Sequence, residues 1–173
     1  AFVNCVNLTS LTLPFISTHV GDLFGARNHN FNAQFVPQLL KTVVIKGGTS
    51  ICDEAFYHCD GLESITIPST VTSIGYDAFL FCNNLKTVNY TGTIDEWAQI
   101  DFDSYNANPL FDIANLYVNG KLVTDVVLET ATKISKFAFH NCGSVNSVVI
   151  GDNVTSIGDS AFANCEGLKK VII

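Results

Sequence analysis

The sequence predicts a strand-rich α/β solenoid, in which about seven coils of chain stack around one shared core. The first observation is a pattern that recurs along the 173 residues. It consists of an Ala-Phe pair, then a Cys, then a Leu or Val, and then two further hydrophobic residues. The second is its period, since Phe56 and Phe79 are 23 residues apart, as are Phe139 and Phe162. A unit this short cannot bury its own hydrophobic face, so successive units must stack.

Five copies keep the full pattern A-F-x-x-C-x-x-(L/V)-x-x-hydrophobic-x-hydrophobic. They begin at Ala1, Ala55, Ala78, Ala138 and Ala161. Two further coils are distorted and keep the strand part, at Leu40–Ile45 and Val123–Leu128. The longer spacings before these coils predict insertions near residues 26–34 and 92–109. We expect residues 1–173 to form a single domain, a fragment of a longer array.

Each predicted coil contains a strand, a turn, a second short extended segment and one helical turn. Strands such as Ile65–Ile67 and Val148–Ile150 are expected to lie parallel in one sheet, about 4.8 Å apart. The second extended segment corresponds to Val71–Gly75, and the helical turn contains the Ala-Phe pair. Asp53 and Asp77 stand just before such turns, where an acid favours the start of a helix.

Composition and charge exclude several classes of protein. The chain is 47% hydrophobic and 14% charged, which supports a buried core and is the reverse of a disordered composition. Its net charge is −7 and its basic residues are not clustered, so a nucleic acid is not expected as a partner. No apolar run approaches the length of about 18 residues that a membrane span needs, so we expect no membrane insertion.

The repeat resembles that of the BspA-like leucine-rich repeats of bacterial and protist surface proteins, A-F-x-x-C-x-x-L-x-x-V-x-I-P-x-x-V-x-x-I-G. The likeness covers nearly the whole chain, and Gly92–Trp97, Asn108–Leu110 and Asn115–Gly120 resemble a variant coil of that family. Cys52 stands where the pattern usually has Gly, and Pro is missing after most strands. The resemblance implies a leucine-rich-repeat solenoid with a parallel β-sheet. It also implies an extracellular or cell-surface protein that acts in adhesion or interaction with varied ligands.

Most of the cysteines share one position of the repeat. These are Cys5, Cys59, Cys82, Cys142 and Cys165. Stacked neighbours would lie within reach of a disulfide, because their Cα atoms would be about 4.8 Å apart. Equivalent side chains in a stack point in parallel, however, which favours free thiols buried as small hydrophobic groups. A Cys59–Cys82 or Cys142–Cys165 bond is the less favoured alternative.

The spacing of potential ligands predicts no metal site and no cofactor. The chain has no C-x-x-C pair, and His58 and His140 stand alone on outward positions, where solvated surface histidines are expected. Asp101 and Asp103 lack the framework of a calcium loop. The outward strand positions hold a single acid, Asp125, so no acid–base pair forms on the sheet and an enzyme is not expected.

Two surfaces are candidates for partner binding. Solenoids use extended sheets for protein ligands, although Ser, Thr and Val are also what an ordinary exposed strand prefers. The helical-turn edge would bring aromatic side chains of adjacent coils together, either as an apolar patch or as packing between turns. The candidate residues are Ser64, Thr66, Thr87, Asn89, Ser147 and Val149 on the strands, and Tyr57 and Phe81 on the turns.

The insertions are expected to differ from each other in character. Thr93 and Glu96 fit a capping box, which predicts a short helix that carries Trp97 onto the core. Residues 26–34, with Asn28, Asn30 and Asn32 among them, are expected to form a polar loop.

These observations predict a non-catalytic protein–protein interaction or adhesion module of a bacterial cell-surface or secreted protein. Its ligand would be a protein, such as host extracellular matrix or the surface of another cell. The alternatives are a structural spacer that projects another domain, and a glycan-binding or glycan-processing solenoid. Solenoids need capping repeats, and the repeat pattern is open at both ends, so we also expect end-to-end self-association.

Overall fold

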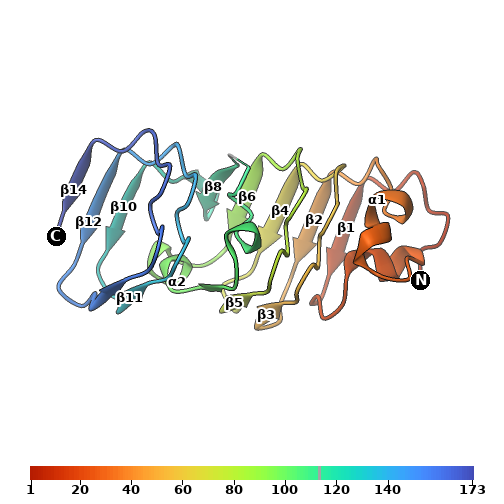
Figure 1. Cartoon of the computed structure of the whole chain (residues 1–173), viewed down its shortest axis with the longest axis horizontal. Helices are drawn as coiled ribbons and strands as arrows, with labels where there is room; N and C mark the ends of the chain where they lie inside the picture. The colour runs from red at the N-terminus through yellow and green to blue at the C-terminus, as the bar shows by residue number, and fades with distance from the viewer. Residues whose placement is uncertain (113) are drawn as a thin grey trace.

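The computed structural model describes residues 1–112 and 114–173, and it is an elongated stack of coils with its termini at opposite ends (Figure 1). The strands of successive coils lie side by side along the long axis, as the repeat period predicts. The fold class, a strand-rich solenoid with parallel sheets, is therefore confirmed.

One side of the solenoid carries the longer strands, which form two sheets. All their pairings are parallel except that of β8 with β9. The first sheet contains β1 (Ser10–Leu13), β2 (Thr42–Ile45), β4 (Ser64–Ile67), β6 (Thr87–Tyr90), β8 (Asn115–Val118) and β9 (Lys121–Leu122). The second contains β10 (Asp125–Leu128), β12 (Ser147–Ile150) and β14 (Lys170–Ile172).

Shorter strands form a second set of parallel sheets, which confirms the second extended segment of each coil. One contains β3 (Ser50–Ile51), β5 (Ser73–Ile74) and β7 (Asp101–Phe102), and the other contains β11 (Lys133–Ile134) and β13 (Ser156–Ile157). The helices are short. They are η1 (Val20–Phe24), η2 (His29–Phe31), α1 (Asn32–Phe35), α2 (Ile94–Ala98) and η3 (Tyr105–Ala107). In the part of the chain that the structure describes, no helix is long and apolar enough to span a membrane.

The structure adds one strand to those that the spacing predicted. The sequence placed the strand after Val123 directly beside the strand after Leu85. Instead β6 pairs with β8, in the register Thr87 to Asn115, and the hairpin of β8 and β9 separates this sheet from that of β10. Residues 92–109 contain α2, β7 and η3, and β7 pairs with β5 as in a regular coil.

The Ala-Phe segments also differ from the single helical turn that was predicted. They are runs of tight turns, in which Glu54 and His58 both have a φ of 55°. Alternate N–H groups, those of Glu54, Phe56 and His58, donate to carbonyls of the next coil at 2.8 to 3.0 Å. A helix this short is unstable alone, whereas the stack supplies partners for these groups. Asp53 likewise reaches the next coil, where it accepts a hydrogen bond from the Tyr76 N–H at 2.8 Å.

The core consists of continuous columns of equivalent side chains. Phe56 and Phe79 stack with ring centroids 5.2 Å apart, and Phe139 and Phe162 stack at 5.0 Å. Trp97 is fully buried on α2, which begins with the predicted capping box, and its indole N–H donates to the Ala138 carbonyl at 2.8 Å. This hydrogen bond joins the irregular coil to the regular coils that follow it.

The stacked columns predict that Phe56→Ala lowers the free energy of unfolding by about 3–5 kcal/mol, because the lost ring leaves a cavity between coils. Phe15→Ala is the matched control, since Phe15 is 57% exposed, and it should change that free energy by no more than about 0.5 kcal/mol. Urea denaturation followed by circular dichroism measures both. Equal losses in the two variants would contradict the column model.

Candidate interaction surface

The strand-face candidates lie in two separate groups. Ser64 pairs with Thr87, and Thr66 pairs with Asn89, on adjacent strands of the first sheet. Ser147 and Val149 lie on β12 in the other sheet. The expected unbroken columns are therefore interrupted by β8 and β9, which bring Asn115 and Tyr117 next to Thr87 and Asn89.

The polar groups of the strand face partly satisfy one another. The Asn89 side-chain amide donates to the Ser64 hydroxyl at 3.4 Å. The hydroxyls of Ser147 and Thr124 donate to the carboxylate of Asp125, and these hydrogen bonds lower its pKa. Such pairing leaves fewer unsatisfied groups for a partner to bind.

The turn edge brings the aromatic candidates together across coils. The rings of Tyr57 and Phe81 meet edge to face with centroids 5.6 Å apart. His58 stacks on Phe81 at 4.4 Å and lies against Tyr57 at 4.7 Å. The predicted contact between these turns is confirmed, and Phe81 remains 40% exposed.

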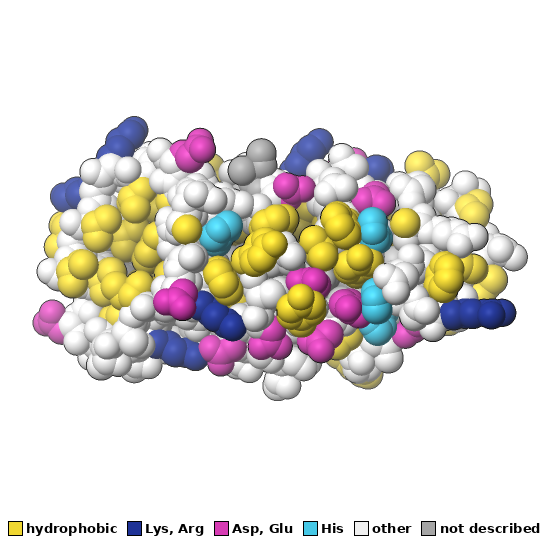
Figure 2. All heavy atoms as spheres, in the orientation of Figure 1, with side chains coloured by type: hydrophobic (Ala, Val, Ile, Leu, Met, Phe, Trp, Pro, Cys, Tyr) yellow, Lys and Arg dark blue, Asp and Glu magenta, His cyan; other side chains and the backbone are white. Residues whose placement is uncertain are grey.

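Further aromatic side chains extend this cluster along the turn edge. Tyr105 lies 5.1 Å from Phe111 and 6.3 Å from Phe137, and Phe137 lies 6.2 Å from His140. A small cleft lined by both Phe81 and Phe111 joins the two groups. We call the whole set the aromatic band. It consists of Tyr57, His58, Phe81, Tyr105, Phe111, Phe137 and His140. On the face seen in Figure 2, hydrophobic and histidine side chains lie along the middle, with acidic side chains above and below them.

Three residues of the band, His58, Phe81 and Phe137, have backbone conformations that are unusual for their type, and the first two share one position of the repeat. His58 and Phe81 have φ values of 55° and 63°, in the left-handed region. In the last two coils the same position is held by Asn141 and Asn164, with φ values of 60° and 59°. Asn adopts this conformation readily, whereas a bulky ring does so at a cost. Phe81 therefore stands where the backbone alone would favour Asn.

The histidines of the band are more enclosed than predicted. His58 and His140 are half-buried, and the Nδ1 atom of each is buried without a hydrogen-bond partner among the described residues. Burial lowers the pKa of His140, which favours its neutral form. Both rings are thus partly exposed, as their outward positions predict, but the Nδ1 atom of each is shielded from solvent.

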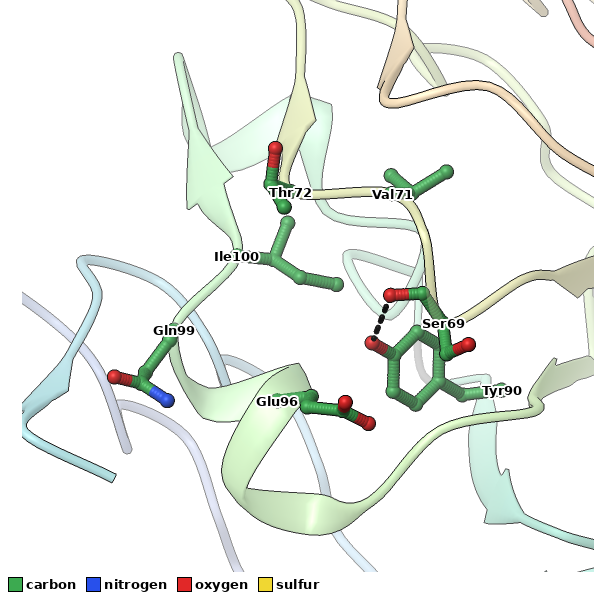
Figure 3. A pocket seen from close by; sticks show the side chains of 7 residues that line it. All are labelled: Ser69, Val71, Thr72, Tyr90, Glu96, Gln99 and Ile100. Atoms are coloured by element: carbon green, nitrogen blue, oxygen red, sulfur yellow. Dashed lines mark hydrogen bonds between the residues drawn. The ribbon is translucent and has the colours of Figure 1, made fainter. Parts of the chain in front are cut away.

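One pocket lies between α2 and the turn before β5 (Figure 3). It has a volume of about 290 Å³ and is lined by Ser69, Val71, Thr72, Tyr90, Glu96, Gln99 and Ile100. The Tyr90 hydroxyl donates to the Ser69 carbonyl at 3.5 Å, and burial raises the pKa of Tyr90 to about 12. The Glu96 carboxylate accepts hydrogen bonds from Thr93 in the capping box. The polar groups of this pocket are therefore already engaged in hydrogen bonds that stabilise the fold.

The cysteine column is confirmed for four of its five members. Cys59, Cys82, Cys142 and Cys165 are buried free thiols, whereas Cys5 is exposed. The Cys82 thiol donates to the Phe56 carbonyl at 3.1 Å. Burial raises the pKa of Cys82 to about 12 and that of Cys142 to about 11.

One cluster of potential ligands was missed by the search for short spacings. His19, His29 and Glu54 each offer a ligand atom, and these atoms lie within 4.8 Å of one another. The segment of residues 26–34, predicted as a polar loop, forms η2 and the start of α1 and carries His29 to this cluster. The distance between the three residues in the sequence explains why spacing alone did not reveal them.

Parallel strands in repeated coils, a second short sheet and continuous Phe and Cys columns define a leucine-rich-repeat solenoid. The family model described as BspA type Leucine rich repeat region matches residues 31–121 and 132–173, with 6 copies. The chain belongs to this family, whose members have roles in protein interaction or structure.

Three solved structures that the chain resembles are of leucine-rich-repeat proteins. The T. pallidum protein TpLRR is 23% identical, with a TM-score of 0.42, over 75% of this chain and 57% of that one. A protein from Bacteroides ovatus is 21% identical, with a TM-score of 0.42, over 98% and 50%. A leucine rich cell surface protein from Faecalibacterium prausnitzii is 19% identical, with a TM-score of 0.33, over 96% and 70%. No curated protein matches the chain.

The thiol environments predict a wide spread of alkylation rates at about pH 8. Cys5 should react with iodoacetamide first, because it is exposed. Cys59, Cys82 and Cys142 should react only after urea unfolds the chain, since burial and a raised pKa leave little accessible thiolate. Peptide mass spectrometry over time measures each site, with Cys5 as the internal control. Labelling of Cys82 in the folded chain at the rate of Cys5 would contradict this burial.

Proposed function

We propose that this chain is a non-catalytic protein-binding module of a bacterial cell-surface or secreted protein, and that the aromatic band is its principal contact surface. The repeat family supports a role in interaction or structure and a surface or extracellular location. The observation that carries the choice of surface is Phe81, a large ring kept 40% exposed on a left-handed backbone position that Asn fills in other coils. Strain of this kind is typically retained where a side chain has a functional role.

The band has the physical properties of a binding surface. Aromatic side chains are enriched in protein interfaces and often dominate their energetics. Tyr105 is 48% exposed and Phe81 40%, while hydrogen bonds between coils hold the backbone of the Phe81 turn. A rigid backbone reduces the entropy lost when a partner binds. The chain's net charge of −7 favours a partner whose apolar contact is surrounded by basic groups.

The strand face is the weaker candidate, because its polar groups already pair with each other. Ser64, Thr66, Thr87 and Asn89 form one continuous patch there, and Ser147 and Val149 belong to another. We retain these residues as the comparison surface for the experiment. A spacer role would require neither surface.

The proposal predicts that Tyr57→Ser with Phe81→Ser weakens binding at least about tenfold, because one half-buried and one exposed ring are lost from one contact. The probes are immobilised extracellular-matrix proteins and intact bacterial cells, with affinity measured by biolayer interferometry. The matched control is a strand-face variant with Thr66→Arg and Thr87→Arg, which should stay within about threefold of the unaltered chain. Circular dichroism checks that both variants fold.

Each outcome of this comparison decides between the surfaces. Loss of binding in the strand-face variant alone would move the contact to the sheet. Tight binding that is unaffected by either variant would overturn both surfaces. Absence of binding to every probe would contradict the binding module and favour the spacer.

A further inference from the structure

We propose that His19, His29 and Glu54 form a zinc site that fastens the segment of residues 19–35 to the repeat stack. The Glu54 carboxylate oxygen Oε2 lies 2.5 Å from His29 Nδ1 and 3.7 Å from His19 Nε2. The three potential ligand atoms all lie within 4.8 Å of one another. They come from three segments that the fold brings to the N-terminal end of the turn edge.

The backbone around each ligand is fixed by contacts within the protein. Val20, next to His19, donates its N–H to the Ala55 carbonyl at 2.8 Å, which ties this segment to the residue after Glu54. The Glu54 N–H donates to the next coil at 2.8 Å. The His29 ring packs edge-on against Tyr57, with centroids 5.1 Å apart.

Asn32 locks the segment that carries His29 onto the solenoid. Its side chain is fully buried, and its amide donates to the Tyr57 carbonyl at 2.7 Å. Gly21 leaves the room for this side chain, because a Cβ there would lie 1.9 Å from Asn32 Oδ1. The ligands are therefore placed before any metal binds, which reduces the cost of forming a site.

The distances are close to those of a zinc site. Zinc binds imidazole nitrogen and carboxylate oxygen at about 2.0–2.2 Å, so neighbouring ligand atoms in a tetrahedral site are about 3.4 Å apart. His19 Nε2 and Glu54 Oε2 are already near this separation. The separation of His29 Nδ1 and Glu54 Oε2 has to lengthen by about 1 Å for both atoms to bind one zinc ion.

The chemistry of the ligands selects the class of metal. Two imidazoles and one carboxylate suit zinc and its transition-metal neighbours, whereas calcium and magnesium prefer oxygen ligands alone. The side chains of His19, His29 and Glu54 are 29%, 24% and 26% exposed, so solvent reaches the cluster and water can fill a fourth position.

The unaltered chain offers a test that needs no substitution, because its four histidines include two outside the cluster. One equivalent of zinc should shift the imidazole nitrogen resonances of His19 and His29 and leave those of His58 and His140 unchanged. After dialysis, elemental analysis should find one zinc per chain, and magnesium should produce no shift. Absence of retained zinc, or shifts at His58 and His140 instead, would overturn the site.

Variants separate this site from adventitious binding by thiols. His29→Ala and Glu54→Gln should each weaken zinc binding at least about tenfold in calorimetry, while His140→Ala should leave it unchanged. Cys5→Ser and Cys52→Ser should also leave it unchanged, and loss of binding in either would assign the metal to a thiol. Zinc should raise the midpoint of thermal unfolding in the unaltered chain and not in Glu54→Gln. An equal rise in both would contradict the proposal.

Discussion

Each coil of this protein depends on the next coil for its backbone hydrogen bonds. The strand β4 pairs with β2 on one side and β6 on the other, and alternate N–H groups of the tight turns also donate across the gap between coils. This ladder sets a fixed distance between equivalent residues, so Phe56 must lie over Phe79 and Cys59 must fit beside Cys82. Stability is therefore shared between neighbours, as expected of a solenoid.

The short distance between adjacent coils also explains where the repeat can have a residue other than its usual glycine. A Cβ on Gly75 would lie 2.5 Å from the Asp53 nitrogen, and one on Gly158 would lie 2.3 Å from the Lys136 nitrogen. Glycine is thus required at these two positions, where the backbone of the preceding coil leaves no room for a side chain. Cys52 holds the equivalent position after β3. Among the described residues, β3 is the edge strand of its sheet, so no preceding strand of that sheet lies beside it. Ser135, after the edge strand β11, instead donates its hydroxyl to Asp101 at 3.2 Å.

The sequence predicts features that repeat or act locally, and it misses those that depend on distant segments meeting. The Phe columns follow from the 23-residue period, and the helix of Trp97 follows from the Thr93–Glu96 capping box. The hairpin that adds β8 does have a local signature, since Asn119 and Gly120 form an Asn-Gly turn with φ values of 49° and 77°. The cluster of His19, His29 and Glu54 has none, because only the folding of the 26–34 segment onto the turns brings its members together.

The two residues between Phe and Cys in each coil are where this fold can vary its surface most freely. They are Tyr57-His58, Leu80-Phe81, His140-Asn141 and Ala163-Asn164 in successive regular coils. The second residue of each pair has a positive φ of 55° to 63°, so the four pairs share one backbone conformation while their side chains vary the surface. Aromatic rings fill the earlier pairs, and the last pair is small and polar, with Asn164 donating to Asn141 at 2.9 Å. Any partner that binds the aromatic band should therefore contact the middle coils more strongly than the last one, because the rings that attract it end at His140.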